Sequence, residues 1–298
     1  MTNNRQYKYD DELFTREDDI SYYLLGLMVT DGCVYEYKSG RYYLRLALSD
    51  YDHMEKIRDL VAPELKLVKT KNRNLWAFKA YSKSYIDWLI KNECVPRKTL
   101  TLKFPDKIPK KYMRDFMRGV MDGDGSIGFR ERGKNTKSSK CYYCSSSLWF
   151  ITGINKYLDS LNIKYSLTIQ KAGRISKPVA NGNGKVIQQK HDHYRTTLNH
   201  ADAYKLLKII YYHKNRLSLE RKQITANKII HYYENRNKTN HFYSALLTKK
   251  EAIKIRKMWA TGKFKKKANL IKYFKTKMSV QVDNSVFYKI LSNKTYKI

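Results

Sequence analysis

The sequence has little cysteine and lacks long apolar runs. Four cysteines in 298 residues are too few for a disulfide-built scaffold, and they fit a reducing compartment. No run approaches the roughly 18 uninterrupted apolar residues of a membrane span, so we expect no membrane partner. Residues 1–19 hold six acidic side chains and no apolar core, which argues against a secretory signal or transit peptide. We therefore expect an intracellular protein, in a bacterial or phage-infected cell or in an organelle with its own genome.

Two of the cysteines, Cys141 and Cys144, form a C-x-x-C pair. A structural zinc needs four ligands, and Cys33 and Cys94 do not supply a second pair. We therefore prefer two cysteines on a strand to a zinc site.

Acidic residues are also scarce, since 27 Asp and Glu stand against 60 Lys and Arg, for a net charge of +33. Such an excess predicts a polyanionic partner, and nucleic acid is the first candidate. Part of the charge is attributable to a genome rich in A and T, because Lys, Asn, Ile and Tyr are all abundant. With 42% hydrophobic and 13% aromatic residues, the chain can build a core and is not expected to be disordered.

The chain repeats itself at a domain-sized interval. Residues 22–32 read YYLLGLMVTDG and residues 115–125 read DFMRGVMDGDG. The aligned pairs, each 93 residues apart, are Gly26 with Gly119, Asp31 with Asp124, and Gly32 with Gly125. This period is too long for a solenoid unit and indicates two fused copies of a small domain.

Hydrophobic periodicity predicts the order α-β-β-α-β-β-α in each copy. We place the first half at residues 1–105, the second at 106–236 and a helical module at 245–298. Residues 235–244, which read NRNKTNHFYS, are interpreted as the linker to that module. The fold class is therefore α+β, with two pseudo-symmetric halves and a small all-α C-terminal module.

LLGLMVTDG and MRGVMDGDG resemble the motif that names the LAGLIDADG homing endonucleases. The resemblance extends over roughly residues 20–235, and two motifs in order at this spacing make it specific. It implies saddle-shaped antiparallel sheets and site-specific cleavage of double-stranded DNA. It also implies two or more divalent ions, Mg²⁺, at an active site that contains the last aspartate of each motif.

The motif has a physical logic of its own. Gly26 and Gly119 lie on apolar helical faces, where a missing side chain lets two helices approach closely. Helices packed in this way would bring their C-terminal ends together and place Asp31 beside Asp124. Two adjacent carboxylates repel each other and favour a divalent cation such as Mg²⁺. The alternative is that each aspartate is a helix-end residue bonded to backbone.

Several neighbours complete the predicted site. The glycines that end the motifs, Gly32 and Gly125, permit the turn into the next strand and are assigned to the metal site with the aspartates. Lys98 in VPRKT and Lys222 in LERKQ occupy matching places in the two halves and are candidate catalytic residues that neutralise the scissile phosphates. They are otherwise ordinary surface lysines. Only the second motif has an acid two residues before its last aspartate, Asp122, where the first has Val29.

The strands are expected to contact DNA through their polar faces. Alternation in RYYLRLAL sets Arg and Tyr against Leu, and KYSLTIQK is predicted to be a half-buried strand with one polar face. A β-ribbon fits the major groove, where Arg and Gln can read bases by paired hydrogen bonds. The alternative is a polar face that is merely solvated. The candidate DNA-binding residues are Arg41, Tyr43, Arg45, Arg130, Arg132, Ser166, Thr168, Gln170, His193 and Arg195.

The C-terminal module is strongly basic. Residues 249–298 hold 15 Lys or Arg and two acidic residues, a net charge of +13. A small helical unit with this charge is interpreted as a helix-turn-helix DNA-binding module whose last helix enters the major groove. Lys265 and Lys266 in the run GKFKKK are its candidate DNA contacts. The alternative is a basic helical tail that packs on the body.

The leading prediction is a monomeric, metal-dependent, site-specific DNA endonuclease that binds double-stranded DNA. A non-catalytic DNA-binding regulator on the same fold is the first alternative, but it would have no use for two juxtaposed carboxylates. An RNA maturase that binds its own intron RNA is the second, and the basic surface would serve it equally well.

Overall fold

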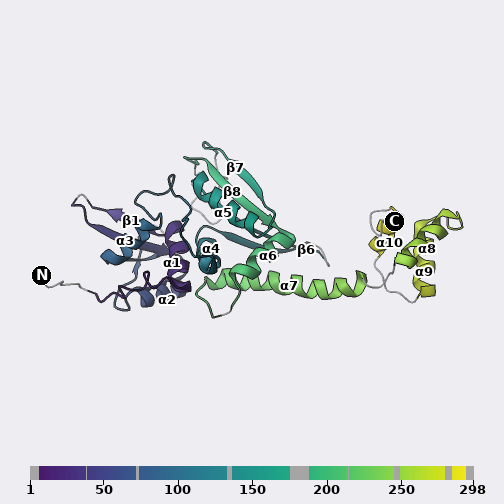
Figure 1. Cartoon of the computed structure of the whole chain (residues 1–298), viewed down its shortest axis with the longest axis horizontal. Coiled ribbons are helices and arrows are strands. Elements are labelled where there is room, and N and C mark those ends of the chain that lie inside the picture. Colours follow the sequence, from purple (N-terminus) through teal and green to yellow (C-terminus); the bar gives the residue numbers. More distant parts are fainter. Residues whose placement is uncertain are drawn as a thin grey trace. The chain divides into compact units, whose positions relative to one another are not determined.

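The computed structural model describes residues 7–292, except 38, 72–73, 133–135, 175–187, 214, 245–248 and 279–283. The chain forms two compact units, residues 1–230 and 231–298 (Figure 1). Within the described residues, no helix combines the length and the apolar composition needed to cross a membrane.

The first half of the larger unit alternates helices and strands as predicted. Its sheet is antiparallel, with the order β1-β2-β4-β3. The elements are α1 (Asp19–Thr30), β1 (Cys33–Glu36), β2 (Tyr42–Leu48), α2 (Tyr51–Val61), β3 (Val68–Lys69), β4 (Trp76–Ala80) and α3 (Lys83–Lys91).

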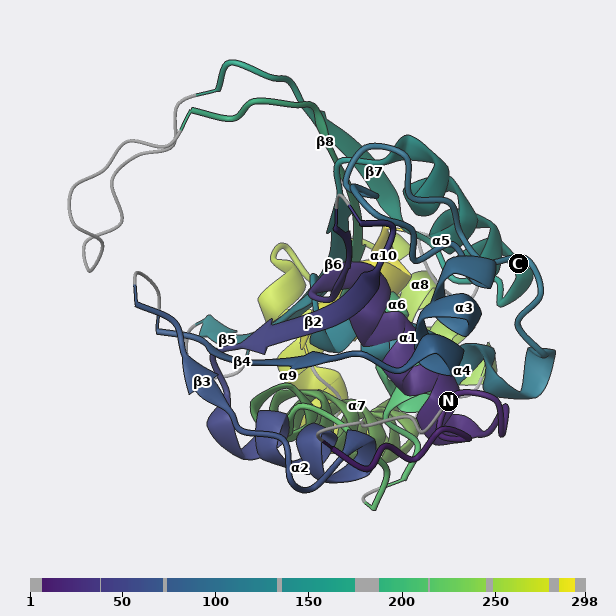
Figure 2. The same cartoon turned by 90° about the vertical axis from the view of Figure 1, so that its left-hand side faces the viewer.

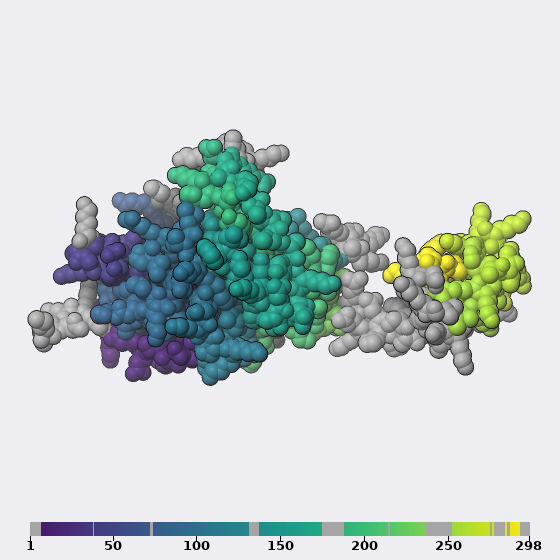
Figure 3. Space-filling model, turned by 45° about the horizontal axis from the view of Figure 1, so that its top comes forward, coloured from purple at the N-terminus to yellow at the C-terminus, as the bar shows by residue number. Residues whose placement is uncertain are grey.

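The second half repeats this plan after a short 3₁₀ turn, η1 (Lys110–Tyr112). Its antiparallel sheet has the matching order β5-β6-β8-β7. The elements are α4 (Met113–Asp122), β5 (Ser126–Arg132), β6 (Thr136–Ser145), α5 (Leu148–Ser160), β7 (Ser166–Gln170), β8 (His193–Asn199) and α6 (His200–Ile210). The predicted α+β class and the two pseudo-symmetric halves are confirmed. The two halves pack directly against each other, purple to blue against teal to green in Figure 3.

The halves meet where α1 crosses α4. A Cβ atom at Gly26 would lie 2.8 Å from the amide nitrogen of Val120 and closer still to the carbonyl oxygen of Phe116. A Cβ atom at Gly119 would in turn lie 2.9 Å from the amide nitrogen of Leu27. The two helices therefore touch main chain to main chain, and a side chain at either glycine would force them apart.

Each sheet buries one face and exposes the other. Leu44 of β2 is 1% exposed, whereas its neighbours Tyr43 and Arg45 are half-buried. In β6, Cys141 and Tyr143 are buried. Helices α2 and α3 contact the first sheet, and α5 and α6 contact the second. Figure 2 shows β2 on one side of α1, with α3 and α5 on the other.

The prediction that residues 165–170 form a half-buried strand is wrong, because the apolar side chains of this strand are exposed. β7 forms the edge of its sheet, and Leu167 and Ile169 are 43% and 51% exposed. Helix α5 contacts the inner strands β6 and β8, so the centre of the sheet is covered while this edge stays accessible.

The predicted linker at residues 235–244 is helical, because helix α7 runs without interruption over Glu220–Ser244. Its sequence contains neither glycine nor proline. Asparagine lowers helix propensity by only a fraction of a kcal/mol, about 0.7 at most, so polar composition alone does not end a helix.

The smaller unit contains three further helices, α8 (Lys249–Ala260), α9 (Lys267–Met278) and α10 (Asn284–Leu291). Gly262, with φ +67°, follows the end of α8. Buried side chains from all three helices form a separate core, which includes Ile255, Leu270 and Phe287. This unit therefore has an apolar core of its own.

Candidate active site

Asp31 and Asp124 follow the C-terminal ends of α1 and α4. Asp31 caps α1, and its N–H donates to the carbonyl of Leu27 over 2.9 Å. A Cβ atom at Gly123 would overlap the side chain of Thr30 and would lie 3.3 Å from Oδ2 of Asp31. The close packing of α1 and α4 thus extends from the two glycines to the C-terminal ends of the helices. It brings the two aspartates close together.

The two carboxylates are open to solvent but are set among many protein atoms. This partial desolvation, together with the charge of Asp124, raises the pKa of Asp31 to about 6. The pKa of Asp124 is also raised, mainly by the same desolvation, and Lys98 and Lys222 oppose the rise at both aspartates. Two accessible carboxylates that resist ionising together are suited to bind a cation.

Lys98 and Lys222 occupy equivalent positions beside the aspartates. Nζ of Lys98 donates to the carbonyl of Gly32, and Nζ of Lys222 donates to the carbonyl of Gly125 over 2.7 Å. Three carbonyls at the end of α4 also lie 2.7 to 3.0 Å from Nζ of Lys222, whose three N–H groups are therefore shared among four acceptors. The side chains are only 8% and 6% exposed, and burial lowers the pKa of Lys222 to about 8. The surface interpretation of these lysines is therefore wrong.

These bonds bear on the proposed role of Gly32 and Gly125 in metal binding. Both carbonyl oxygens already face an ammonium group, which makes them poor ligands for another cation. The described residues contain no cluster of three or more His, Cys, Asp and Glu side chains around a possible ion. Asp31 and Asp124 nevertheless offer the carboxylate oxygens that a hard divalent ion prefers as ligands.

The extra acid of the second motif has a different environment from Asp124. Asp122 is 3% exposed and accepts hydrogen bonds from the hydroxyls of Tyr23 and Tyr211 and from the N–H of Leu219. Burial raises its pKa against these donors. Tyr23 belongs to α1, so Asp122 joins the two halves and does not face the Asp31–Asp124 site. Sequence spacing alone could not separate this role from metal binding.

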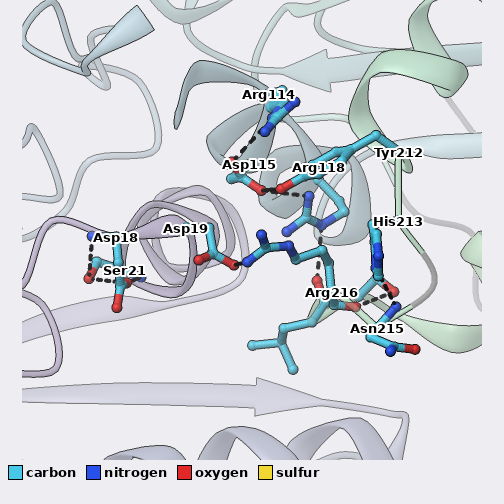
Figure 4. A network of polar contacts seen from close by, with 12 residues as sticks. Asp18, Asp19, Ser21, Arg114, Asp115, Arg118, Tyr212, His213, Asn215 and Arg216 are labelled. Atoms are coloured by element: carbon cyan, nitrogen blue, oxygen red, sulfur yellow. Dashed lines mark hydrogen bonds and ion pairs between the residues drawn. The ribbon is translucent and has the colours of Figure 1, made fainter. Parts of the chain in front are cut away.

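A second polar network, shown in Figure 4, lies toward the opposite ends of α1 and α4. Asp115 and Arg118 form a fully buried ion pair at 2.8 Å, and Tyr212 donates to Asp115. Arg216 is hydrogen-bonded to Asp19 at the start of α1. No sequence motif marks this network, because its members come from segments far apart in the chain.

A cavity of about 290 Å³ opens beside Asp124. Thr30, Lys98, Cys144 and His193 also line it, so it draws on both halves. His193 opposes part of the rise that burial causes in the pKa of Asp124. His193, a candidate DNA-binding residue, therefore lies next to an aspartate of the site.

Strand register places most of the predicted DNA-binding residues on the exposed faces. In the second sheet, Thr168 pairs with Arg195 and Gln170 pairs with His193, so these side chains share one face with Ser166. The ring of Tyr142, on the same face, lies 4.5 Å from the guanidinium of Arg195.

The remaining candidates fall into three groups. Arg130 lies on the same face of the second sheet, opposite Ser138, and Arg132 follows two residues later, but its side chain lies outside the described residues. Arg41 is exposed just before β2, whose Tyr43 and Arg45 lie on the open face of the first sheet. Lys265 and Lys266 belong to the smaller unit and are exposed before α9.

Comparisons with known proteins give the following similarities. No known family's sequence profile matches the chain. An uncharacterized protein of Methanocaldococcus jannaschii is 24% identical over 215 residues, which cover 70% of this chain and 70% of that protein. The LAGLIDADG meganuclease I-AabMI, bound to uncleaved DNA, matches 79% of this chain and 96% of its own, at 15% identity and a TM-score of 0.46. I-DmoI, in complex with DNA and Ca, matches 72% of this chain and 97% of its own, at 17% identity and a TM-score of 0.44.

Proposed function

We propose that this protein is a metal-dependent, site-specific endonuclease that cuts both strands of double-stranded DNA. The observation that carries the proposal is the meeting of Asp31 and Asp124, one from each half, at the ends of two helices that cross through glycine. Both carboxylates are accessible, and a strand of each sheet, β1 or β5, begins two residues after each of them. A protein that only bound DNA would place two carboxylates near phosphate at an electrostatic cost.

Mg²⁺ held by Asp31 and Asp124 would supply an activated water and positive charge at the leaving oxygen. The chain's own part is to keep both carboxylates ionised and in place. Lys98 and Lys222 lower the pKa of both aspartates, and they tie down the turns that follow the two motifs. Their positive charge also favours a phosphate brought to the same place.

DNA binding is assigned to three surfaces. The exposed faces of the two sheets would enter the major groove on either side of the aspartates, with Arg45 and Arg195 among the side chains that reach base edges. We assign the C-terminal unit to a helix-turn-helix module, in which Lys265 and Lys266 contact phosphates. Because one chain supplies both halves, it would act as a monomer and could recognise an asymmetric target.

The test uses the full chain and a target selected from a randomised duplex library. Asp31→Asn and Asp124→Asn should each abolish Mg²⁺-dependent cleavage of the selected duplex while binding persists, because each change removes a ligand charge. Asp52→Asn, at an exposed site on α2, is the matched control and should cut normally. Cleavage at the parental rate by the double Asn variant would disprove the assigned site.

The same experiment separates the endonuclease from its first alternative. If the parent chain binds the selected duplex tightly but never cuts it, with any divalent ion, the protein is a DNA-binding regulator. Selection of the chain's own flanking transcript over any duplex would instead indicate an RNA partner.

A further inference from the structure

Four tyrosines gather on the open side of the first sheet and form what we call the tyrosine patch, namely Tyr35, Tyr37, Tyr43 and Tyr81. Tyr43 lies at its centre. Its ring is stacked on Tyr35 with centroids 4.9 Å apart, and the rings of Tyr37 and Tyr81 lie 5.0 and 5.7 Å away. The three outer tyrosines are 40%, 45% and 52% exposed.

The patch is not part of the core. Leu44, next to Tyr43 in β2, points to the opposite face and is buried, so the core is built without the patch. Arg45 pairs with Lys79 on the same open face as Tyr43, and Nζ of Lys79 lies 5.1 Å from the centroid of the Tyr43 ring. A cluster of exposed aromatic rings with cations at its border is typical of a contact surface.

The two halves differ at these positions. In the first sheet Tyr35 pairs with Tyr43, and in the second sheet Gly128 pairs with Lys140. The strand register therefore places these two pairs at equivalent positions of the two halves. The repeat and the register likewise align Tyr37 with Arg130 and Tyr81 with Asn199. Where the first half presents four tyrosines, the second half presents glycine, arginine, lysine and asparagine. The two sheets therefore offer different chemistry to a duplex that lies along both.

We propose that the tyrosine patch determines specificity by contacting the 5-methyl groups of thymines in one half of the DNA target. This inference rests on the proposed DNA-binding function. The thymine methyl is the apolar group that the major groove displays, and apolar side chains recognise it by contact. At the equivalent positions the second half has Arg130 and Lys140, which would recognise its half-site by hydrogen bonds to base edges.

The packing within the patch favours a duplex over unpaired bases. One side of the Tyr43 ring is stacked on Tyr35, and Lys79 lies over the ring as well. Tyr43 is therefore not free to stack on an extruded base, as single-strand binding requires. A pre-packed surface of this kind contacts groups that already project into the groove.

The experiment replaces thymine by uracil, which lacks only the methyl group and keeps every pairing hydrogen bond. Duplexes are first selected from a randomised library with the full chain, and thymines are then replaced in one half-site at a time. Replacement in one half-site should weaken binding about fourfold for each contacted methyl, the equivalent of roughly 0.8 kcal/mol. Replacement in the other half-site should leave the affinity unchanged.

Variants assign the effect to the patch. Tyr35→Ala should bind thymine and uracil duplexes equally, whereas Tyr35→Phe, which keeps the ring, should still discriminate. Tyr51→Ala removes a tyrosine on α2 that is also 40% exposed, and it should discriminate like the parent.

The possible results distinguish a failure of this inference from a failure of the proposed DNA-binding function. A chain that selects no duplex refutes the proposed DNA-binding function. A chain that binds its duplex but tolerates uracil in both half-sites refutes only the role of the patch. Tighter binding of single strands than of the duplex, lost in Tyr35→Ala, would also overturn the inference, because it would show stacking on unpaired bases.

Discussion

Replacing Gly26 by alanine tests whether the close crossing of α1 and α4 holds the two aspartates together. The added Cβ atom would lie 2.8 Å from the amide nitrogen of Val120, where ordinary contacts begin at 3.4 Å. The backbones would have to separate by at least the difference of 0.6 Å, and by more at the carbonyl oxygen of Phe116. Neither atom can rotate away, because both belong to the main chain of a buried helix.

The expected magnitude follows from two opposing effects. Alanine is favoured over glycine in a helix by about 1 kcal/mol. Overpacking of a well-packed core costs about 1–3 kcal/mol, and the rigid neighbours place this case at the upper end. We therefore expect Gly26→Ala to lower the free energy of unfolding by about 2 kcal/mol. Cleavage should fall more than DNA binding, because the separation displaces Asp31 from Asp124.

Urea unfolding, followed by circular dichroism, measures the change in stability. Gly128→Ala is the matched control, because its added Cβ atom would lie 3.8 Å from the nearest atom, the carbonyl oxygen of Lys140. This control should stay within about 0.5 kcal/mol of the parent. A Gly26→Ala protein as stable and as active as the parent would refute the reasoning.

Three further changes probe other parts of the structure. Asp122→Val removes the acceptor shared by three buried donors and should destabilise the chain by about 3 kcal/mol in urea unfolding, whereas equal stability would rule out its bridging role. Burial lowers the pKa of His53 to about 4 from 6.5, so the unfolded chain takes up this proton first as the pH falls. The free energy of unfolding should therefore drop by about 3 kcal/mol between pH 6.5 and 4. His53→Phe should remove that part of the pH dependence, and an unchanged pH profile would contradict the assignment. Lys266→Ala should weaken binding to all duplexes alike and reduce the salt dependence by about one counterion at most, and a change in base preference would contradict a phosphate contact.

The environment of His53 accounts for the direction of its pKa shift. Tyr23 donates its hydroxyl proton to Asp122, so Nε2 of His53, at 2.9 Å, must donate to Tyr23. Nδ1 of His53 has no hydrogen-bond partner among the described residues. Protonation would therefore leave a buried N–H unpaired, which disfavours the charged form.

The sequence alone was sufficient for the plan of the two halves and for the pairs that meet at their centre. Two residue pairs, Gly26 with Gly119 and Asp31 with Asp124, recur at the same spacing. On two helices, this pattern predicts a close crossing at the glycines and neighbouring helix ends at the aspartates. Alternation in β2 likewise identified its buried leucines, because side chains of a strand alternate between faces whatever lies around them.

Only the tertiary structure decided what surrounds each group. Asp122 and Asp124 are two residues apart, yet one is enclosed by tyrosines from other helices and the other is open to solvent. The four carbonyls around Lys222 belong to a segment about a hundred residues away. The exposure of Leu167 depends on strand order, which local periodicity does not contain. Local geometry follows from neighbouring residues, but burial and electrostatic environment follow from segments that only folding brings together.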